Sequence, residues 1–201
     1  MKTVLIDYGS GNIKSIQFAL ARIGCHAVLS HDAEMIKNAD RVIFPGVGEA
    51  SNAMLKLKKS KLDVLIPALK QPVLGICLGM QLMCKHTAEG DTNGLGIFQT
   101  DVLKFSDNIK VPQVGWNNIT KLRSNLFDNI EENVFMYFVH SFYATICQDT
   151  VASIDGTIPY SAALRNNNFY GVQFHPEKSG EIGEQILKNF LVNNYENNSS
   201  N

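Results

Sequence analysis

The chain has 201 residues, of which 45% are hydrophobic, and its 18 Lys and Arg nearly balance 19 Asp and Glu. This length suits one domain with a sizeable core, which we expect over residues 1–195, followed by a frayed tail at 196–201. The formal net charge of −1 lacks the basic surplus that nucleic-acid binding requires. Because no apolar segment approaches the roughly 20 residues that span a bilayer and the N-terminus lacks a signal peptide's anatomy, we expect a cytoplasmic protein that binds neither nucleic acid nor membrane.

Short apolar runs alternate with amphipathic stretches in the first half of the chain. Strands are predicted at 3–6, 27–29, 41–44 and 72–76, and helices at 13–23, after Asp32 and at 50–69. Strands that alternate with helices are typical of an α/β fold with a mostly parallel central sheet.

The second half is rich in strands. They are predicted near 102–105, 117–122, 134–144, 151–154 and 169–175, followed by a last helix from Ile182 to about Tyr195.

Gly75-Ile76-Cys77-Leu78-Gly79 joins the strand at 72–76 to a helix and has the G-x-nucleophile-x-G form of a nucleophile elbow. The small flanking residues relieve the crowding of such a turn. A helix N-terminus favours the thiolate of Cys77, and the Leu78 N–H is placed to bind an oxyanion. The alternative is a buried structural cysteine in a glycine-containing turn.

Phe174-His175-Pro176-Glu177 supplies the groups that such a nucleophile needs. Pro176 biases His175 toward extended geometry, in which His175 and Glu177 share a face. A carboxylate then orients the imidazole while the imidazole deprotonates Cys77. The three residues predict a Cys-His-Glu catalytic triad.

Pro45-Gly46-Val47-Gly48 ends a strand with two glycines, which allows the Val47 N–H to turn toward an oxyanion, although a plain turn explains the motif equally well. The loop at residues 7–12 lacks the last glycine of a dinucleotide-binding motif, since Lys14 stands there. Cys77, Cys84 and His86 do not have the spacing of a closed zinc site. We therefore expect no cofactor, no metal and free thiols.

These motifs together resemble class I glutamine amidotransferases, most closely the glutaminase subunits of imidazole glycerol phosphate synthase in histidine biosynthesis. The resemblance runs through nearly the whole chain and rests on segments 7–12, 45–48, 75–81, 115–117, 138–141 and 171–179. It implies the fold of that family and a glutaminase that releases glutamate and ammonia.

Residue roles follow from the resemblance. It assigns the nucleophile to Cys77, the proton shuttle to His175 and the orienting carboxylate to Glu177. The other implied positions are the oxyanion hole at Val47 and Leu78, the glutamine pocket at Gly46, Gln81, Ser141 and Phe142, and a docking face at Asn12, Trp116, Tyr137 and Lys178.

The implied partner is a (β/α)8 barrel cyclase that forms a heterodimer with the glutaminase and receives its ammonia. Gln113 departs from the family, which usually has histidine at this position. This departure keeps open the same chemistry for a paralogous synthase. The sequence argues against two further alternatives. A stand-alone cysteine hydrolase should not need Gln81 or the Pro45-Gly46-Val47-Gly48 segment, and a binding protein without catalysis should not keep Cys77, His175 and Glu177.

Overall fold

A seven-stranded sheet forms the centre of the protein in a computed structural model that describes residues 1–9, 11–106 and 108–192. Its strands, in spatial order, are β11 (Thr150–Ile154), β12 (Tyr160–Asn166), β13 (Phe169–Val172), β4 (Val73–Ile76), β3 (Arg41–Phe44), β1 (Thr3–Ile6) and β2 (Val28–Ser30). The five strands from β13 to β2 run parallel, and β12 and β11 run antiparallel to their neighbours. The predicted mostly parallel α/β sheet is confirmed.

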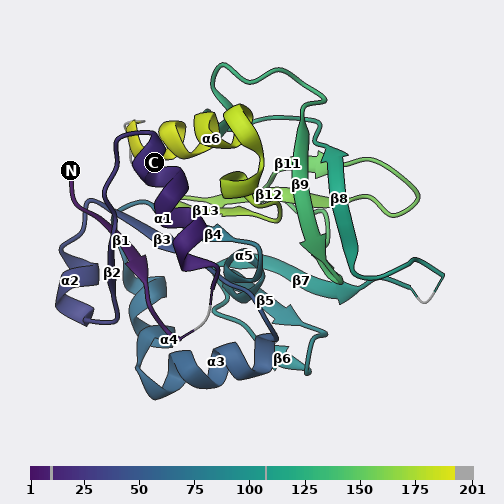
Figure 1. The fold of residues 1–201 in the computed structure, drawn as a ribbon. Helices are drawn as coiled ribbons and strands as arrows, with labels where there is room; N and C mark the ends of the chain where they lie inside the picture. Colours follow the sequence, from purple (N-terminus) through teal and green to yellow (C-terminus); the bar gives the residue numbers. More distant parts are fainter. Residues whose placement is uncertain (10, 107, 193–201) are drawn as a thin grey trace, which may run out of the picture.

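Both faces of the sheet are buried because successive strand residues point to opposite sides. Leu5, Ile43 and Leu74 pack with α1 (Ile13–Arg22) and α6 (Gly180–Val192). The alternate strand residues pack in a second core with α2 (Ala33–Lys37), α3 (Ala50–Lys59), α4 (Leu62–Leu65) and α5 (Leu78–Met83). Figure 1 shows α1 and α6 toward the top of the molecule and α3 and α4 at the bottom.

The helical stretch predicted over 50–69 is helical over most of its length but is broken at Lys61. The structure has α3, then α4, then the 3-10 turn η1 (Ile66–Ala68), with Lys61 in the left-handed region at φ 57° between the first two. Leu57 and Leu62 are both buried but lie five residues apart, which is about 140° around one helix. The chain therefore turns at Lys61 to bury both.

The remaining strands lie outside the central sheet. A four-stranded sheet has the order β10 (Phe142–Ala144), β7 (Phe98–Lys104), β5 (Cys84–Thr87) and β6 (Thr92–Asn93), and β8 (Gln113–Asn118) pairs with β9 (Phe135–His140) in an antiparallel ribbon. Two 3-10 turns, η2 (Asn125–Phe127) and η3 (Pro176–Lys178), complete the described elements.

Several predictions in this half need correction. The strand predicted at 117–122 lies at 113–118, and β5, β6 and β12 were not predicted. The last helix begins at Gly180, two residues before the predicted start, and its predicted end, like the tail at 196–201, lies outside the described residues. Across the described ranges, no helix has the length and apolar character to cross a membrane.

Candidate active site

Three adjacent parallel strands bring the predicted motifs together. The order β13–β4–β3 places β4 in the middle, and the carboxyl ends of parallel strands meet at one edge of a sheet. Pro45 follows β3, Cys77 follows β4, and His175 lies three residues beyond β13. The sheet therefore gathers segments that are up to 130 residues apart in the sequence.

Cys77 stands on a strained turn between β4 and α5. It has φ 54° and ψ −111°, and its backbone N–H donates to the Val172 carbonyl oxygen at 2.8 Å. A Cβ added at Gly79 would lie 2.1 Å from the Phe44 carbonyl oxygen, and one added at Gly75 would lie 2.6 Å from the Met83 sulfur. Only glycine lets α5 lie this close to β3, as the elbow motif predicts.

His175 and Glu177 form a buried hydrogen bond between Nδ1 and Oε1 at 2.8 Å. The expected face-sharing in an extended segment is only partly correct, because Glu177 lies within η3 and only His175, which precedes η3, is extended. Two hydrogen bonds also hold the backbone of His175. Its backbone N–H donates to the Tyr137 carbonyl oxygen, and its carbonyl oxygen accepts from the Ser179 hydroxyl. The imidazole is therefore fixed from both β9 and η3.

The charges around His175 decide its protonation. Burial lowers the pKa of the imidazole, but the hydrogen bonds and negative charges of Cys77 and Glu177 outweigh it and raise the pKa to about 10. The second oxygen of Glu177, Oε2, is buried and has no hydrogen-bond partner among the described residues. The protonated imidazole is also hydrogen-bonded to Cys77, so His175 joins the predicted nucleophile to Glu177.

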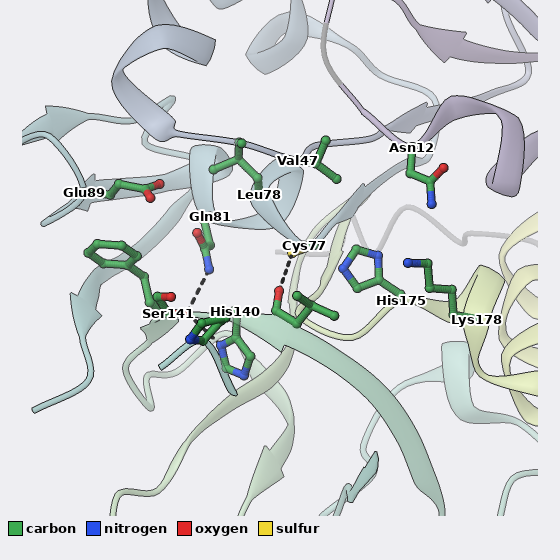
Figure 2. A pocket seen from close by; sticks show the side chains of 14 residues that line it. Asn12, Val47, Cys77, Leu78, Gln81, Glu89, His140, Ser141, His175 and Lys178 are labelled. Atoms are coloured by element: carbon green, nitrogen blue, oxygen red, sulfur yellow. Dashed lines mark hydrogen bonds between the residues drawn. The ribbon is translucent and has the colours of Figure 1, made fainter. Parts of the chain in front are cut away.

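A cavity of about 290 Å³ opens in front of Cys77. Figure 2 shows Glu89 and Gln81 on one side of Cys77, and His175, Lys178 and Asn12 on the other. The lining residues are Asn12, Val47, Gly48, Cys77, Leu78, Gln81, Glu89, Pro112, Val139, His140, Ser141, Phe142, His175 and Lys178.

Most of the predicted site residues line this cavity, and four do not. Gly46 packs against α5, where an added Cβ would lie 2.4 Å from the Gly79 nitrogen. Glu177 lies behind His175. Trp116 and Tyr137 lie on the β8–β9 ribbon, where their rings meet edge to face with centroids 5.9 Å apart.

Three polar residues of the site were not predicted to act. Glu89 lines the cavity and accepts a hydrogen bond at Oε2 from the Ala50 N–H, and burial raises its pKa. His140 is buried, and burial lowers its pKa to about 4. Gln173, fully buried, lies next to Cys77. His140 and Gln173 fall within motif segments, whereas nothing in the sequence around Glu89 indicates the cavity.

Comparisons with known proteins identify the family of this chain. The family model described as "Glutamine amidotransferase class-I" matches residues 4–194. The imidazole glycerol phosphate synthase subunit HisH of Bacteroides fragilis (strain YCH46) is 54% identical over 95% of this chain and 99% of its own length. The protein of that name from Pectobacterium atrosepticum is 45% identical over the same shares.

Solved structures show the same fold at low identity. A chain in the structure of PurLQS from Thermotoga maritima has a TM-score of 0.71 at 18% identity, and the match covers 94% of this chain and 97% of that one. A chain described as a glutamine amidotransferase has a TM-score of 0.74 at 16% identity, over 94% of this chain and 96% of its own. With the family model matching nearly the whole sequence, the chain belongs to the class-I glutamine amidotransferases.

Proposed function

We propose that this chain is the glutaminase subunit of an imidazole glycerol phosphate synthase, and that one domain over residues 1–195 carries the whole activity. It hydrolyses glutamine to glutamate and ammonia for histidine biosynthesis. The observation that carries the proposal is Cys77 on a strained elbow beside His175, whose imidazole is hydrogen-bonded to buried Glu177. We place the protein in the cytoplasm, where the nucleophilic thiol stays reduced.

The chemistry follows from the placement of these groups. The Cys77 thiolate attacks the carboxamide carbon of glutamine, and the N–H groups of Val47 and Leu78 bind the oxyanion. His175 gives its proton to the departing nitrogen, so the C–N bond breaks and ammonia leaves. Water then adds to the thioester, returns a proton to His175 and releases glutamate as the C–S bond breaks. Glu177 keeps the imidazole oriented throughout.

The Glu89 side of the cavity suits the amino-acid end of glutamine. Glu89 provides a carboxylate for the substrate ammonium, and the backbone at Ser141 and Phe142 adds polar groups nearby. The Gln81 side chain donates to the Phe142 carbonyl at 3.0 Å, which holds α5 and β10 together around the substrate. Gly46 serves this pocket indirectly, by allowing β3 to lie against α5.

The opposite side of the cavity suits a partner. Trp116 is 55% exposed and Phe135 60% exposed on one face of the β8–β9 ribbon, and Lys178 Nζ lies 5.6 Å from the Tyr137 ring centre. Exposed aromatic clusters of this kind are typical of protein interfaces. Together with Asn12 at the cavity mouth, they form the docking face for a (β/α)8 barrel cyclase that takes up the ammonia.

A second candidate is the same glutaminase serving a paralogous synthase. It is favoured by Gln113, because the family usually has histidine at this position. Gln113 lies at the start of β8, next to the proposed docking face. Gln113 hydrogen-bonds to the Lys110 carbonyl oxygen and lies away from the Cys77 cavity. The two candidates therefore share their chemistry and differ in the partner.

Glutamate release by the isolated chain, then with a histidine-pathway cyclase and its nucleotide ligand, tests both candidates. We expect the cyclase to raise the rate strongly, because docking turns the Val47 N–H toward the oxyanion. Cys77→Ala should abolish activity and Cys147→Ala should retain it. Activity without stimulation by the cyclase would support the paralogous synthase, and near wild-type activity in Cys77→Ala would contradict the glutaminase mechanism.

Binding to the cyclase tests the docking face separately. Trp116→Ala removes a large exposed aromatic group, so we expect the affinity for the cyclase to fall at least about 30-fold, as at an interface hot spot. Leu55→Ala, on exposed α3, is the matched control and should bind as wild type does. Equal affinity of the Trp116 variant and wild type would place the partner on another surface.

A further inference from the structure

A chain of buried side-chain hydrogen bonds reaches the sulfur of Cys77. Gln173, the first residue after β13, is 0% exposed, and Gln81 on α5 is 4% exposed. The two side-chain amides meet at 2.8 Å, and Gln173 Nε2 lies 3.6 Å from Cys77 Sγ. Neither residue was predicted to touch the nucleophile.

The orientation of each amide follows from the Phe142 carbonyl. This oxygen only accepts hydrogen bonds, so the Gln81 atom 3.0 Å from it is the NH2 group. The same NH2 group lies 2.8 Å from the Gln173 side chain, which must present its oxygen there. Gln173 therefore turns its own NH2 group toward Cys77, because reversing Gln81 would bring two acceptors together and reversing Gln173 would bring two donors together.

His140 also hydrogen-bonds to the Phe142 carbonyl oxygen, where this series of hydrogen bonds begins. Burial lowers its pKa to about 4, so the ring is neutral near pH 7 and carries one N–H. His140 Nδ1 lies 2.8 Å from the Phe142 carbonyl oxygen, which fixes the proton on Nδ1, and Nε2 accepts from the Tyr160 hydroxyl at 3.3 Å. The Phe142 carbonyl thus accepts from His140 and Gln81 together.

We propose that Gln173 is a catalytic residue of this hydrolysis, which donates a side-chain N–H to the Cys77 sulfur and stabilises the thiolate in its attacking position; the proposal rests on the function proposed above. His175 also hydrogen-bonds to the sulfur, which thus has two N–H donors, and the Val139 carbonyl oxygen lies 3.7 Å from it. A hydrogen bond from a neutral amide to a charged sulfur stabilises the thiolate over the thiol. Gln81 is a positioning residue in this arrangement, because it holds the Gln173 amide in the donating orientation.

Alkylation of Cys77 by iodoacetamide as a function of pH tests the proposal without glutamine. In Gln173→Met, which has similar length but no N–H, the alkylation profile should move to higher pH and the rate below its midpoint should fall roughly tenfold. In Gln81→Leu the rate should fall by a smaller factor, roughly threefold. The other titratable groups that line the cavity, Glu89, His140, His175 and Lys178, are common to all these proteins, so the comparison isolates the two glutamines.

The remaining cysteines and a second glutamine serve as controls. Cys84 is 0% exposed and stays unreactive while the protein is folded, and Cys25 and partly exposed Cys147, which do not line the cavity, should keep their wild-type profiles. If Gln173→Met exposes the buried thiols, Gln173→Leu takes its place. Gln99→Met removes a glutamine that donates to the Gly96 carbonyl on the surface and should leave Cys77 unchanged.

Steady-state kinetics separates this role from a structural one. We expect Gln173→Met to lower kcat for glutamine by about the same factor as the alkylation rate, with KM within about twofold of wild type. An unchanged alkylation profile in a folded, glutamine-hydrolysing variant would overturn the role of Gln173. Absence of hydrolysis in the wild-type complex would instead overturn the glutaminase function itself.

Discussion

Cys77 is held in a backbone conformation that residues with side chains rarely adopt, with φ 54° and ψ −111°. Such a conformation costs on the order of 1–3 kcal/mol and persists only where surrounding contacts impose it. Here the bond from the Cys77 N–H to Val172 and the close packing of Gly79 on Phe44 impose it. The strain holds the sulfur at the cavity wall, between His175 and Gln173.

A comparison of Cys77→Gly with Cys77→Ala measures this strain. Both variants lose the nucleophile, but glycine adopts a positive φ freely whereas alanine does not. After allowing for the greater flexibility of glycine in the unfolded chain, we expect Cys77→Gly to be more stable by about 1 kcal/mol. Urea denaturation of the two proteins provides the measurement. A Cys77→Ala variant as stable as Cys77→Gly would show that the turn is unstrained.

At the scale of elements, the site depends on how closely α5 lies against β3. All six residues of α5 are buried, and the helix begins directly after Cys77. Gly79 is in its first turn, with no room for a Cβ next to the Phe44 carbonyl. The position of the elbow is therefore set by the contact between a helix and a neighbouring strand.

Gly79→Ala should disrupt both the fold and the activity. Its Cβ would lie 2.1 Å from backbone that cannot rotate away, so α5 must shift, and we expect a loss of about 2–3 kcal/mol in stability together with most glutaminase activity. Gly156→Ala is the matched control, because an added Cβ there meets nothing within 4 Å. Thermal unfolding and glutamate release measure both variants. Wild-type values for Gly79→Ala would mean that α5 moves without consequence for the elbow.

At the scale of the whole molecule, two buried histidines make stability depend on pH in opposite directions. The pKa of His140 is lowered to about 4, so the unfolded chain binds more protons between pH 4 and about 6.5, and stability falls as the pH drops through this window. The pKa of His175 is raised to about 10, so its contribution is complete below about pH 6.5 and is lost as the pH rises toward 10.

Replacing His140 should therefore make the free energy of unfolding depend less on pH between pH 6.5 and 4. We expect the wild-type protein to lose up to about 3 kcal/mol from this group between pH 6.5 and 4, and His140→Phe to lack this component. Urea denaturation across the pH range measures the difference, with His31→Phe at an exposed position as control. Parallel profiles for wild type and His140→Phe would show that folding does not lower the pKa of His140.

Within the proposed complex, the two sides of the cavity have different tasks. Glu89 and Gln81 lie on one side of Cys77, which we propose binds the amino-acid end of glutamine, and Asn12 and Lys178 lie on the other, toward the proposed docking face. This arrangement separates binding of the amino acid from release of ammonia. It also places the partner next to η3, the turn that carries Glu177 and Lys178.

The sequence by itself determined the features that depend only on residues close together in the chain. The alternation of strands and helices, the elbow at Cys77 and the pairing of His175 with Glu177 all depend on neighbours in the chain, and the family followed from their combination. The break at Lys61 and the position of β8 were not predicted correctly, because contacts with distant elements decide which residues are buried there. This burial overrides the local periodicity of the sequence.

Only the tertiary structure decided which distant residues meet. Cys77 and Gln173 are 96 positions apart and Gln81 and Phe142 are 61 apart, and each pair meets only because β13, α5 and β10 pack together. Glu89 reaches the cavity in the same way, through a bond to α3. Hydrogen bonds between remote side chains depend on strand order and helix packing, and neither is encoded in any local pattern.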